Sequence, residues 1–238
     1  MILFIKLLLA HLLGDFIWQP NSWVADKEIK KHKSIYLYIH ILLHGVLAAV
    51  LVADIGFIPY AILIAVTHGI IDLMKLNFQK PKTKRTWFIV DQIAHLLILI
   101  GIAFFYHRNS IIPILSFNSF WILITGILLV TKPASIFIKT IISIWSPENQ
   151  ISQKDNSLAS AGNYIGILER LFVVCFILTG HFEAIGFLLA AKSIFRFGDL
   201  KEAKDRKLTE YVMIGTLISF GISILVGLAI QALLLQLP

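Results

Sequence analysis

Charged residues are scarce in this sequence, because Asp, Glu, Lys and Arg together make up only 15% of its 238 residues. Soluble domains carry about 25% charged and about 45–50% apolar residues, whereas 58% of the residues here are hydrophobic. They form long runs, and a run of about 20 residues is enough to cross the hydrocarbon core of a bilayer. We therefore exclude a large soluble domain and expect the chain to lie in a lipid bilayer.

Cysteine is almost absent as well. The single one, Cys175, lies within an apolar run, which excludes an intrachain disulfide. The His-Glu-x-x-His signature of zinc metalloproteases is also missing. The net charge of +7 arises mostly in the connecting segments, as in membrane proteins whose cytoplasmic loops are basic. We therefore expect no nucleic-acid partner.

Hydropathy predicts an all-α fold, a polytopic transmembrane helical bundle of about eight spans. The expected spans are 2–19, 35–54, 58–76, 87–106, 112–131, 163–180, 182–198 and 209–236. The first apolar segment lacks a basic start and a small-residue cleavage site, so we interpret it as a retained helix rather than a signal peptide.

Basic residues alternate between the loops of this arrangement. Three or more lysines or arginines occur in each of the loops 20–34, 75–86, 132–162 and 199–208. The connections between the other spans contain at most one, and these are 54–57, 107–111 and 180–181. Because basic loops stay on the cytoplasmic side, both termini are predicted on the outer side.

The spans group into three predicted parts. Residues 1–110 form a four-helix transmembrane module, and residues 163–238 form a three-helix one. Between them, residues 111–162 provide the fifth span, an interfacial segment and a polar cytoplasmic loop. Pro133 is expected to end or kink the fifth span, and Trp145 suits the headgroup level.

Each of the first four expected spans carries two ionisable residues spaced four positions apart. The pairs are His11 and Asp15, His40 and His44, His68 and Asp72, and Asp91 and His95. Such pairs lie on one helix face, and ionisable groups in a membrane usually face the bundle interior. In the predicted topology the three Asp and His40 form a layer nearer the cytoplasm, and the other four His lie about one turn deeper.

Imidazole and carboxylate groups together suit zinc, iron or manganese. We therefore predict a divalent metal ion bound by these eight residues, with Asp15 or Asp91 as the catalytic base and Gln19 as a substrate contact. Eight candidate ligands are more than the four that one tetrahedral ion needs, so two alternatives stay open. The site holds two metal ions, or some Asp residues accept a hydrogen bond from the second ring nitrogen of a ligating His. A hydrogen-bonded polar core without metal is the simplest alternative.

The C-terminal part carries further charges at membrane depth. Lys192 and Arg196 share a helix face and lie near the depth expected for Glu169. An ion pair with snorkelling basic side chains is the simpler interpretation. A basic pocket for a phosphate or a lipid headgroup is the alternative, and it would make Lys192 and Arg196 substrate-binding residues.

At these residues the sequence resembles the DUF3307 family of bacterial membrane proteins of unknown function. The resemblance is carried by His11-Leu-Leu-Gly-Asp15-Phe-Ile-Trp-Gln19, the His40/His44 pair, Thr67-His68-Gly-Ile-Ile-Asp72, Asp91-Gln92-Ile-Ala-His95-Leu, Glu169-Arg170, Ala190-Ala-Lys192-Ser-Ile-Phe-Arg196-Phe-Gly-Asp199 and Thr209-Glu210-Tyr-Val. It implies a location in the bacterial inner membrane and supplies no activity. A looser similarity of pattern to membrane-bound metal-dependent hydrolases raises the expectation of hydrolysis modestly.

These features favour a metal-dependent hydrolase of an amphiphilic substrate, because a metal activates water and the site lies close to the interface. A metal-ion or proton transporter is the main alternative. The pairs gather in the inner half of the spans, however, and a path through the outer half would have only Asp54 and Glu183. A haem or di-iron redox centre and a structural metal site without catalysis are the remaining alternatives.

Overall fold

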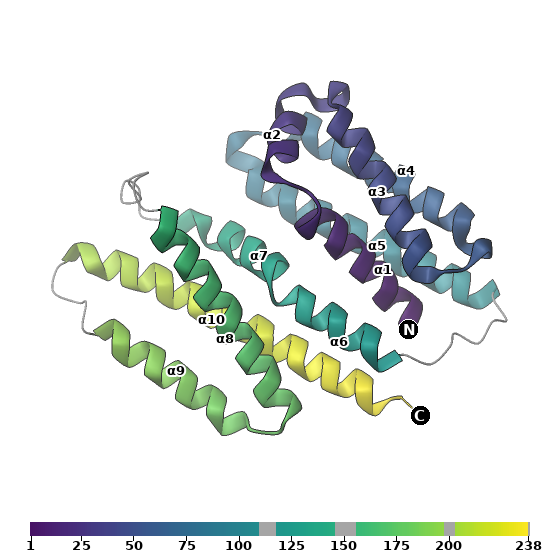
Figure 1. Cartoon of the computed structure of the whole chain (residues 1–238). Helices are drawn as coiled ribbons and strands as arrows, with labels where there is room; N and C mark the ends of the chain where they lie inside the picture. Colours follow the sequence, from purple (N-terminus) through teal and green to yellow (C-terminus); the bar gives the residue numbers. More distant parts are fainter. Residues whose placement is uncertain (110–117, 146–155, 198–202, 238) are drawn as a thin grey trace. The chain divides into compact units, whose positions relative to one another are not determined.

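The computed structural model describes residues 1–109, 118–145, 156–197 and 203–237, and every regular element within these ranges is a helix (Figure 1). The prediction of an all-helical chain is confirmed for the described residues. The chain divides into two compact units, Met1–Trp121 and Ile122–Pro238. The expected start of the fifth span and most of the polar loop 146–162 lie outside the described residues.

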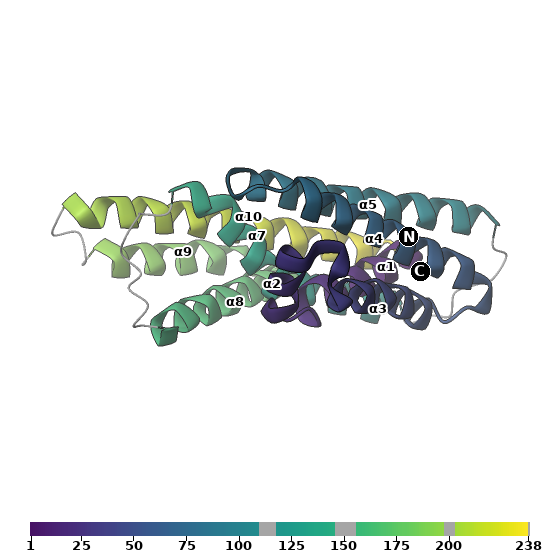
Figure 2. The ribbon, with the colours of Figure 1, turned by 90° about the horizontal axis from the view of Figure 1, so that it is seen from above.

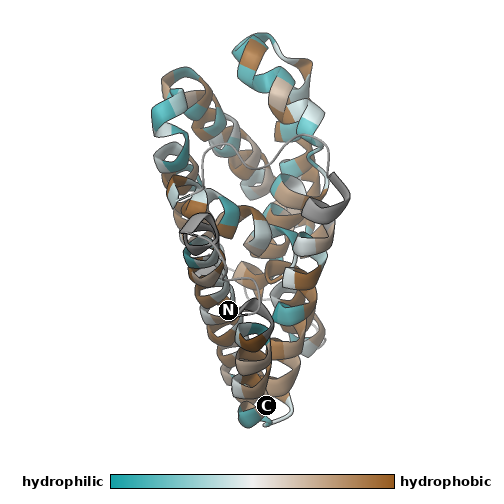
Figure 3. Cartoon of the chain, turned by 90° about the vertical axis from the view of Figure 1, so that its left-hand side faces the viewer, coloured by the Kyte–Doolittle hydropathy of each residue, from teal (hydrophilic) through white to brown (hydrophobic). Residues whose placement is uncertain are grey.

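Six helical segments of the described chain are long and apolar enough to cross a bilayer. They are Ile35–Val52, Ile55–Phe78, Pro81–Tyr106, Asn118–Trp145, Ala161–Leu178 and Thr209–Leu235. Figure 3 shows hydrophobic residues along most of the length of the long helices. Many large apolar side chains are exposed on their outer faces, for example Leu42, Ile62 and Leu97, as expected of helices that contact lipid tails. The chain is thus a multi-pass helical membrane protein.

Two of the eight expected spans do not form straight helices of this length. The first consists of α1 (Ile2–Leu12) and the π-helical turn η1 (Leu13–Ile17), after which the chain bends by 82°. Pro20 stands at the bend, where its ring disfavours a helical conformation of the preceding residue. The seventh is α9 (Phe182–Phe197), a helix of 16 residues. Eight spans, with both termini outside, therefore stays a prediction.

Four helices of the first unit pack lengthwise. The helix α1 contacts α3 (Ile35–Val52) and α5 (Lys84–Asn109), and α4 (Ile58–Phe78) contacts both α3 and α5 (Figures 1 and 2). At one end of the four helices their inner faces form an apolar core, made of Leu3, Leu7, Ala48, Phe57, Ala61, Ile64, Leu99 and Ile102. Towards the other end the same faces carry the His and Asp pairs.

The short helix α2 (Asn21–Lys30) lies at this second end. It contacts α3, while the following turn η2 (Lys31–Lys33) contacts α4. Trp23 of α2 stacks on Tyr36 with ring centroids 5.3 Å apart, and Ile29 remains 80% exposed. Tryptophan, exposed apolar groups and lysines in one short segment are typical of the headgroup level of a membrane. We therefore interpret α2 as an interfacial helix.

In the second unit, α6 (Asn118–Leu129) runs into α7 (Lys132–Ile142), and α10 (Ala203–Leu235) packs against α7 and α8 (Asn156–Leu178). The interfacial segment predicted between the fifth span and the polar loop, residues 135–145, packs one face, including Ile138 and Ile142, into the unit. Arg170 of α8 is buried at the break between α6 and α7. It donates hydrogen bonds to the carbonyls of Val130 and Thr131 and to two serines, Ser135 and Ser219.

Candidate metal centre

Asp15 lies in the π-helical turn that ends the first helix. Turns of this kind are rare and occur frequently at functional sites. The preceding residue, Gly14, lies directly against the ring of His44, so a Cβ atom there would come within 2.5 Å of His44 Cε1 and Nε2. Glycine at this position therefore allows α1 and α3 to approach closely enough for Asp15 and His44 to meet.

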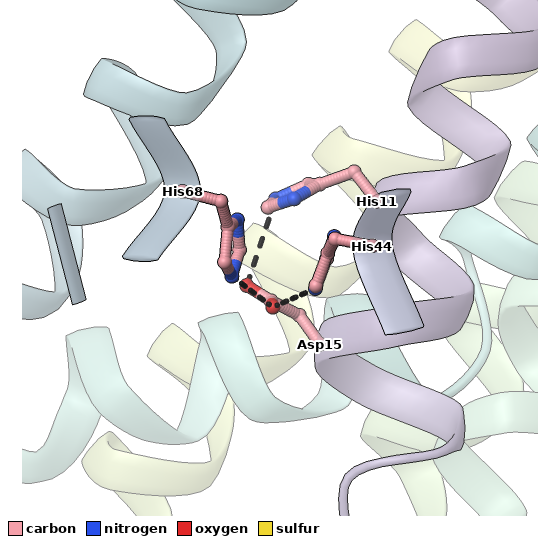
Figure 4. Close-up of side chains that lie close together, drawn as sticks. All are labelled: His11, Asp15, His44 and His68. Carbon is pink, nitrogen blue, oxygen red and sulfur yellow. Dashed lines mark hydrogen bonds and ion pairs between the residues drawn. The ribbon is translucent and has the colours of Figure 1, made fainter. Parts of the chain in front are cut away.

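Three imidazole groups place their Nε2 atoms around one carboxylate oxygen, Asp15 Oδ1. The distances to this oxygen are 3.0 Å from His44, 3.2 Å from His40 and 3.5 Å from His68. The Nε2 atoms of His40 and His68 are themselves 3.1 Å apart. Figure 4 shows the rings of His44 and His68 directed at the carboxylate from α3 and α4. All three rings are buried.

These separations match those between the ligands of one metal ion. Zinc binds imidazole nitrogen and carboxylate oxygen at about 2.0–2.1 Å, which sets the ligand atoms of a tetrahedral site roughly 3.3 Å apart. Two neutral Nε2 atoms 3.1 Å apart, as in His40 and His68, share at most one hydrogen bond, whereas a cation between them satisfies both lone pairs. Among the described residues, His11, His44, His68 and Asp15 each place one ligand atom within 4.8 Å of the others, as do His40, His68 and Asp72. The first of these groups, three histidines and Asp15, is a donor set suited to a divalent ion.

The remaining histidines adjoin this group. His11 Nε2 lies 3.6 Å from Asp15 Oδ2, as Figure 4 also shows, and His95 stacks on His68 with ring centroids 4.0 Å apart. Neither ring nitrogen of His95 has a hydrogen-bond partner in the described chain, and neither does Asp91 Oδ1. Ligand atoms of Asp15, Asp91 and His95 lie within 4.8 Å of one another, so a second ion would satisfy these buried atoms.

The structure thus brings all eight predicted ligands into one group. We name it the His/Asp cluster, and it comprises His11, Asp15, His40, His44, His68, Asp72, Asp91 and His95. Asp15 was expected in the layer nearer the cytoplasm, but its carboxylate lies among the histidines of the deeper layer as well as next to His40. Asp72 lies at the edge, with its oxygens 3.8 Å from His40 Nε2 and 3.9 Å from His68 Nε2.

Two lysines also contact the cluster, although the sequence predicted both of them in basic loops. Lys27 Nζ donates to Asp72 Oδ2 at 2.8 Å, and Lys75 Nζ donates to Asp91 Oδ2 at 2.9 Å. Lys75 follows Asp72 by three residues, a spacing that indicates a shared helix face once α4 is known to extend to Phe78. Lys27 has no comparable signal, because its contact depends on the bend that folds α2 over the helix ends.

Gln92 is a further participant, although as the direct chain neighbour of Asp91 it is expected to point about 100° away from it around the helix and to serve in packing. Its Nε2 donates to Asp15 Oδ2 at 3.0 Å and to Asp91 Oδ2 at 3.1 Å, and its Oε1 lies 3.2 Å from His11 Nε2. Its side chain therefore links two carboxylates of the cluster. Gln19, predicted as a substrate contact, places its Nε2 2.9 Å from His40 Nε2.

A polar cavity of about 50 Å³ lies between α2 and the cluster. Its walls are formed by Asp15, Gln19, Val24, Lys27, Glu28, His40, Asp72, Lys75, Leu76 and Gln79. A smaller space of about 10 Å³ lies on the far side, between four histidines and apolar residues of the core. The polar cavity gives water and small polar groups a place beside the predicted ligands.

The predicted substrate-binding residues of the C-terminal part lie in the second unit. Lys192 Nζ donates to Glu169 Oε2 at 2.5 Å, which is the ion pair that the simpler interpretation expects. Arg196 belongs to α9, but its side chain lies outside the described residues. A substrate-binding role for either residue stays a prediction.

Comparison with known proteins identifies the family. A family model described as "Protein of unknown function (DUF3307)" matches residues 3–124, just over half of the chain. The matched range contains every member of the His/Asp cluster, Gln19, Gln92 and both lysines. No curated protein and no solved structure matches the chain.

Proposed function

The chain belongs to the DUF3307 family of proteins of unknown function, and from this premise we propose that it is a membrane-embedded, metal-dependent hydrolase of an amphiphilic substrate. One observation carries the proposal: three Nε2 atoms, of His40, His44 and His68, lie within 3.5 Å of Asp15 Oδ1. Zinc, iron and manganese accept such a mixed set of ligands. The bacterial inner membrane is the location that we propose.

The cluster also holds groups that can move a proton. A bound divalent ion lowers the pKa of a water molecule in contact with it to about 7. Asp91 is buried and keeps one oxygen, Oδ1, without a hydrogen-bond partner in the described chain, while Lys75 and Gln92 hold the other. If a single ion is bound and leaves this oxygen free, Asp91 is well placed to accept a proton as the general base. Asp15 is a metal ligand in this proposal, and Gln92 links it to Asp91.

The depth of the cluster indicates an amphiphilic substrate. His40 lies five residues after the start of α3, and Asp72 lies six residues before the end of α4. At about 1.5 Å per residue, both lie roughly one to two turns from the helix ends covered by α2. A reacting bond at this level belongs to a molecule whose polar end enters the cavity while its apolar part stays in lipid.

Transport is less well supported by the first unit. The half of its four helices farther from α2 is closed by the apolar core around Leu7, Phe57 and Leu99. A path for protons or metal ions needs ionisable or polar groups along its length. Within the described residues of this core, the buried side chains are apolar.

Elemental analysis of the purified protein tests the metal site. We expect about one or two equivalents of a divalent transition metal in the full chain, and loss of most of it in His44→Ala and His68→Ala. His181→Ala is the matched control, since His181 is exposed in the second unit. Monodisperse elution of each variant from size-exclusion chromatography establishes that it is folded. Metal-free wild-type protein, or equal metal in all variants, contradicts the proposal.

A hydrolysis assay tests the reaction itself. Membrane lipid extract is incubated with the protein, and released products are followed by mass spectrometry. We expect product with metal-loaded protein, none after chelation, and recovery when the metal is returned. Metal-loaded protein that releases nothing from the extract would favour a structural metal site instead.

A further inference from the structure

Five charged side chains lie together in the first unit; Asp15, Lys27, Asp72 and Asp91 are buried or nearly so, and Lys75 is partly buried. Lys27 pairs with Asp72 and Lys75 pairs with Asp91, at 2.8 and 2.9 Å. Asp15 has no lysine or arginine partner among the described residues, since its contacts are histidines and Gln92. With neutral histidines, these three carboxylates and two ammonium groups carry a formal charge of −1.

A divalent ion changes the sign of this charge. One ion makes the group formally +1 and two ions make it formally +3. Uncompensated charge at membrane depth is costly, so ionisable groups there pair with opposite charges. Glu28, at the rim of the cavity, does not supply the missing negative charge, because it pairs with Lys84 at 2.6 Å. The loaded site therefore favours an anionic ligand, either the hydroxide formed from a metal-bound water or the anionic group of a substrate that displaces it.

The polar cavity is the place where this anion fits. Both lysines line it, together with Asp15 and His40. Its volume of about 50 Å³ holds a few water molecules, which is roughly the number of heavy atoms in a phosphate group. Gln79 also lines the cavity, and its Oε1 is buried without a hydrogen-bond partner. Its Nε2 donates to Glu28 Oε1 at 3.4 Å.

The membrane level of the cavity indicates what carries the anion. Three of its wall residues, Val24, Lys27 and Glu28, belong to α2. This helix has the tryptophan, lysines and exposed Ile29 of an interfacial segment. Phosphate groups of lipids lie at that level, and phosphate is also the anion that ammonium groups and metal ions bind together in many sites.

We propose that the cavity binds the phosphate group of a phosphate monoester, held between the metal and the ammonium groups of Lys27 and Lys75. This inference rests on the proposed function and names its substrate class. Hydrolysis then forms a bond between the water oxygen and phosphorus and breaks the bond from phosphorus to the alcohol oxygen. One proton of the water passes to the departing alcohol, and inorganic phosphate remains.

The test uses full-length, zinc-loaded protein in detergent. Two probes are titrated separately: inorganic phosphate, and micelles that contain phosphatidic acid, with diacylglycerol micelles as the uncharged reference. We expect zinc-dependent binding of a phosphate probe, weakened about tenfold or more by Lys27→Gln and by Lys75→Gln, since each removes a charge-assisted contact. Preference for phosphatidic acid assigns the site to a lipid, and equal binding of both probes assigns it to free phosphate as well.

The controls separate the two proposals. Lys30→Gln changes an exposed lysine of the same helix and should bind phosphate like the wild type, while Lys27→Arg keeps the charge and should restore binding. Zinc content is measured for every variant. If the wild type holds zinc but binds no phosphate, or if neither lysine substitution changes phosphate affinity, this inference is wrong. The proposed metal centre is unaffected by that result. Failure of the wild type to hold zinc contradicts the metal centre itself.

Discussion

Asp15 presents both carboxylate oxygens to the cluster. Its Oδ1 faces three histidines, and its Oδ2 lies 3.0 Å from Gln92 Nε2 and 3.6 Å from His11 Nε2. One residue therefore belongs to the donor set of three histidines and also to the group with Asp91 and His95. If two ions are bound, Asp15 is the residue suited to bridge them, as carboxylates do in two-metal sites.

We predict that Asp15→Asn lowers metal affinity at least about 100-fold, because the amide removes the negative charge that all these contacts share and even outlying partners of ligands contribute 10–100-fold. Metal titration followed by a chelator competition measures the change. Asp54→Asn serves as the control, because Asp54 lies at the opposite end of the unit, where Tyr106 and Gly56 donate to it. Unchanged affinity in Asp15→Asn would exclude Asp15 as a ligand.

Residues of the cluster differ in how far the sequence could predict them. The His and Asp pairs share a helix face through a local spacing of four, and the cost of ionisable groups in lipid predicts that this face points inward. Gln92 is adjacent to Asp91 in the chain, and its link to Asp15 of another helix depends on tertiary packing. The sequence could not predict Lys27 for the same reason, because its buried ion pair with Asp72 forms only when α2 folds over the cluster.

At the scale of elements, the π-helical turn and the bend after it shape the site. Hydropathy alone predicted one continuous span over 2–19, since it records apolar content and not direction. The chain bends by 82° between Ile17 and Asn21, and this bend brings Lys27 and Glu28 of α2 to the cavity. Pro20 lies at this bend, but a proline does not set the angle between two helices.

The close approach of α1 to α3 yields a prediction for Gly14→Ala. Its Cβ would lie 2.5 Å from His44, so either the ring or the helix must shift, at a cost of about 1–3 kcal/mol. We expect a lower thermal unfolding temperature in detergent together with weaker metal binding. Gly101→Ala is the matched control, because a Cβ there has nothing within 4 Å and alanine favours the helix by about 0.5–1 kcal/mol. Equal behaviour of both variants would contradict the close packing at Gly14.

At the scale of the whole molecule, the cluster lies entirely within one of the two units. The family match over residues 3–124 ends close to the boundary of the first unit at Trp121. The second unit has its own apolar cores and its own buried charge, Arg170, whose partners all lie in that unit. The sequence indicated separate N- and C-terminal groups of helices, while the boundary itself depends on packing that hydropathy does not record.

We therefore predict that residues 1–121, expressed alone, insert into the membrane and hold the same metal content per chain as the full protein. The reason is that every member of the cluster, both lysines and the wall of the polar cavity lie within this range, on helices that pack against one another. Elemental analysis of both proteins after purification in one detergent makes the comparison, with His68→Ala in the fragment as the metal-free reference. A folded fragment without metal, beside a full chain that retains it, would show that the second unit completes the site.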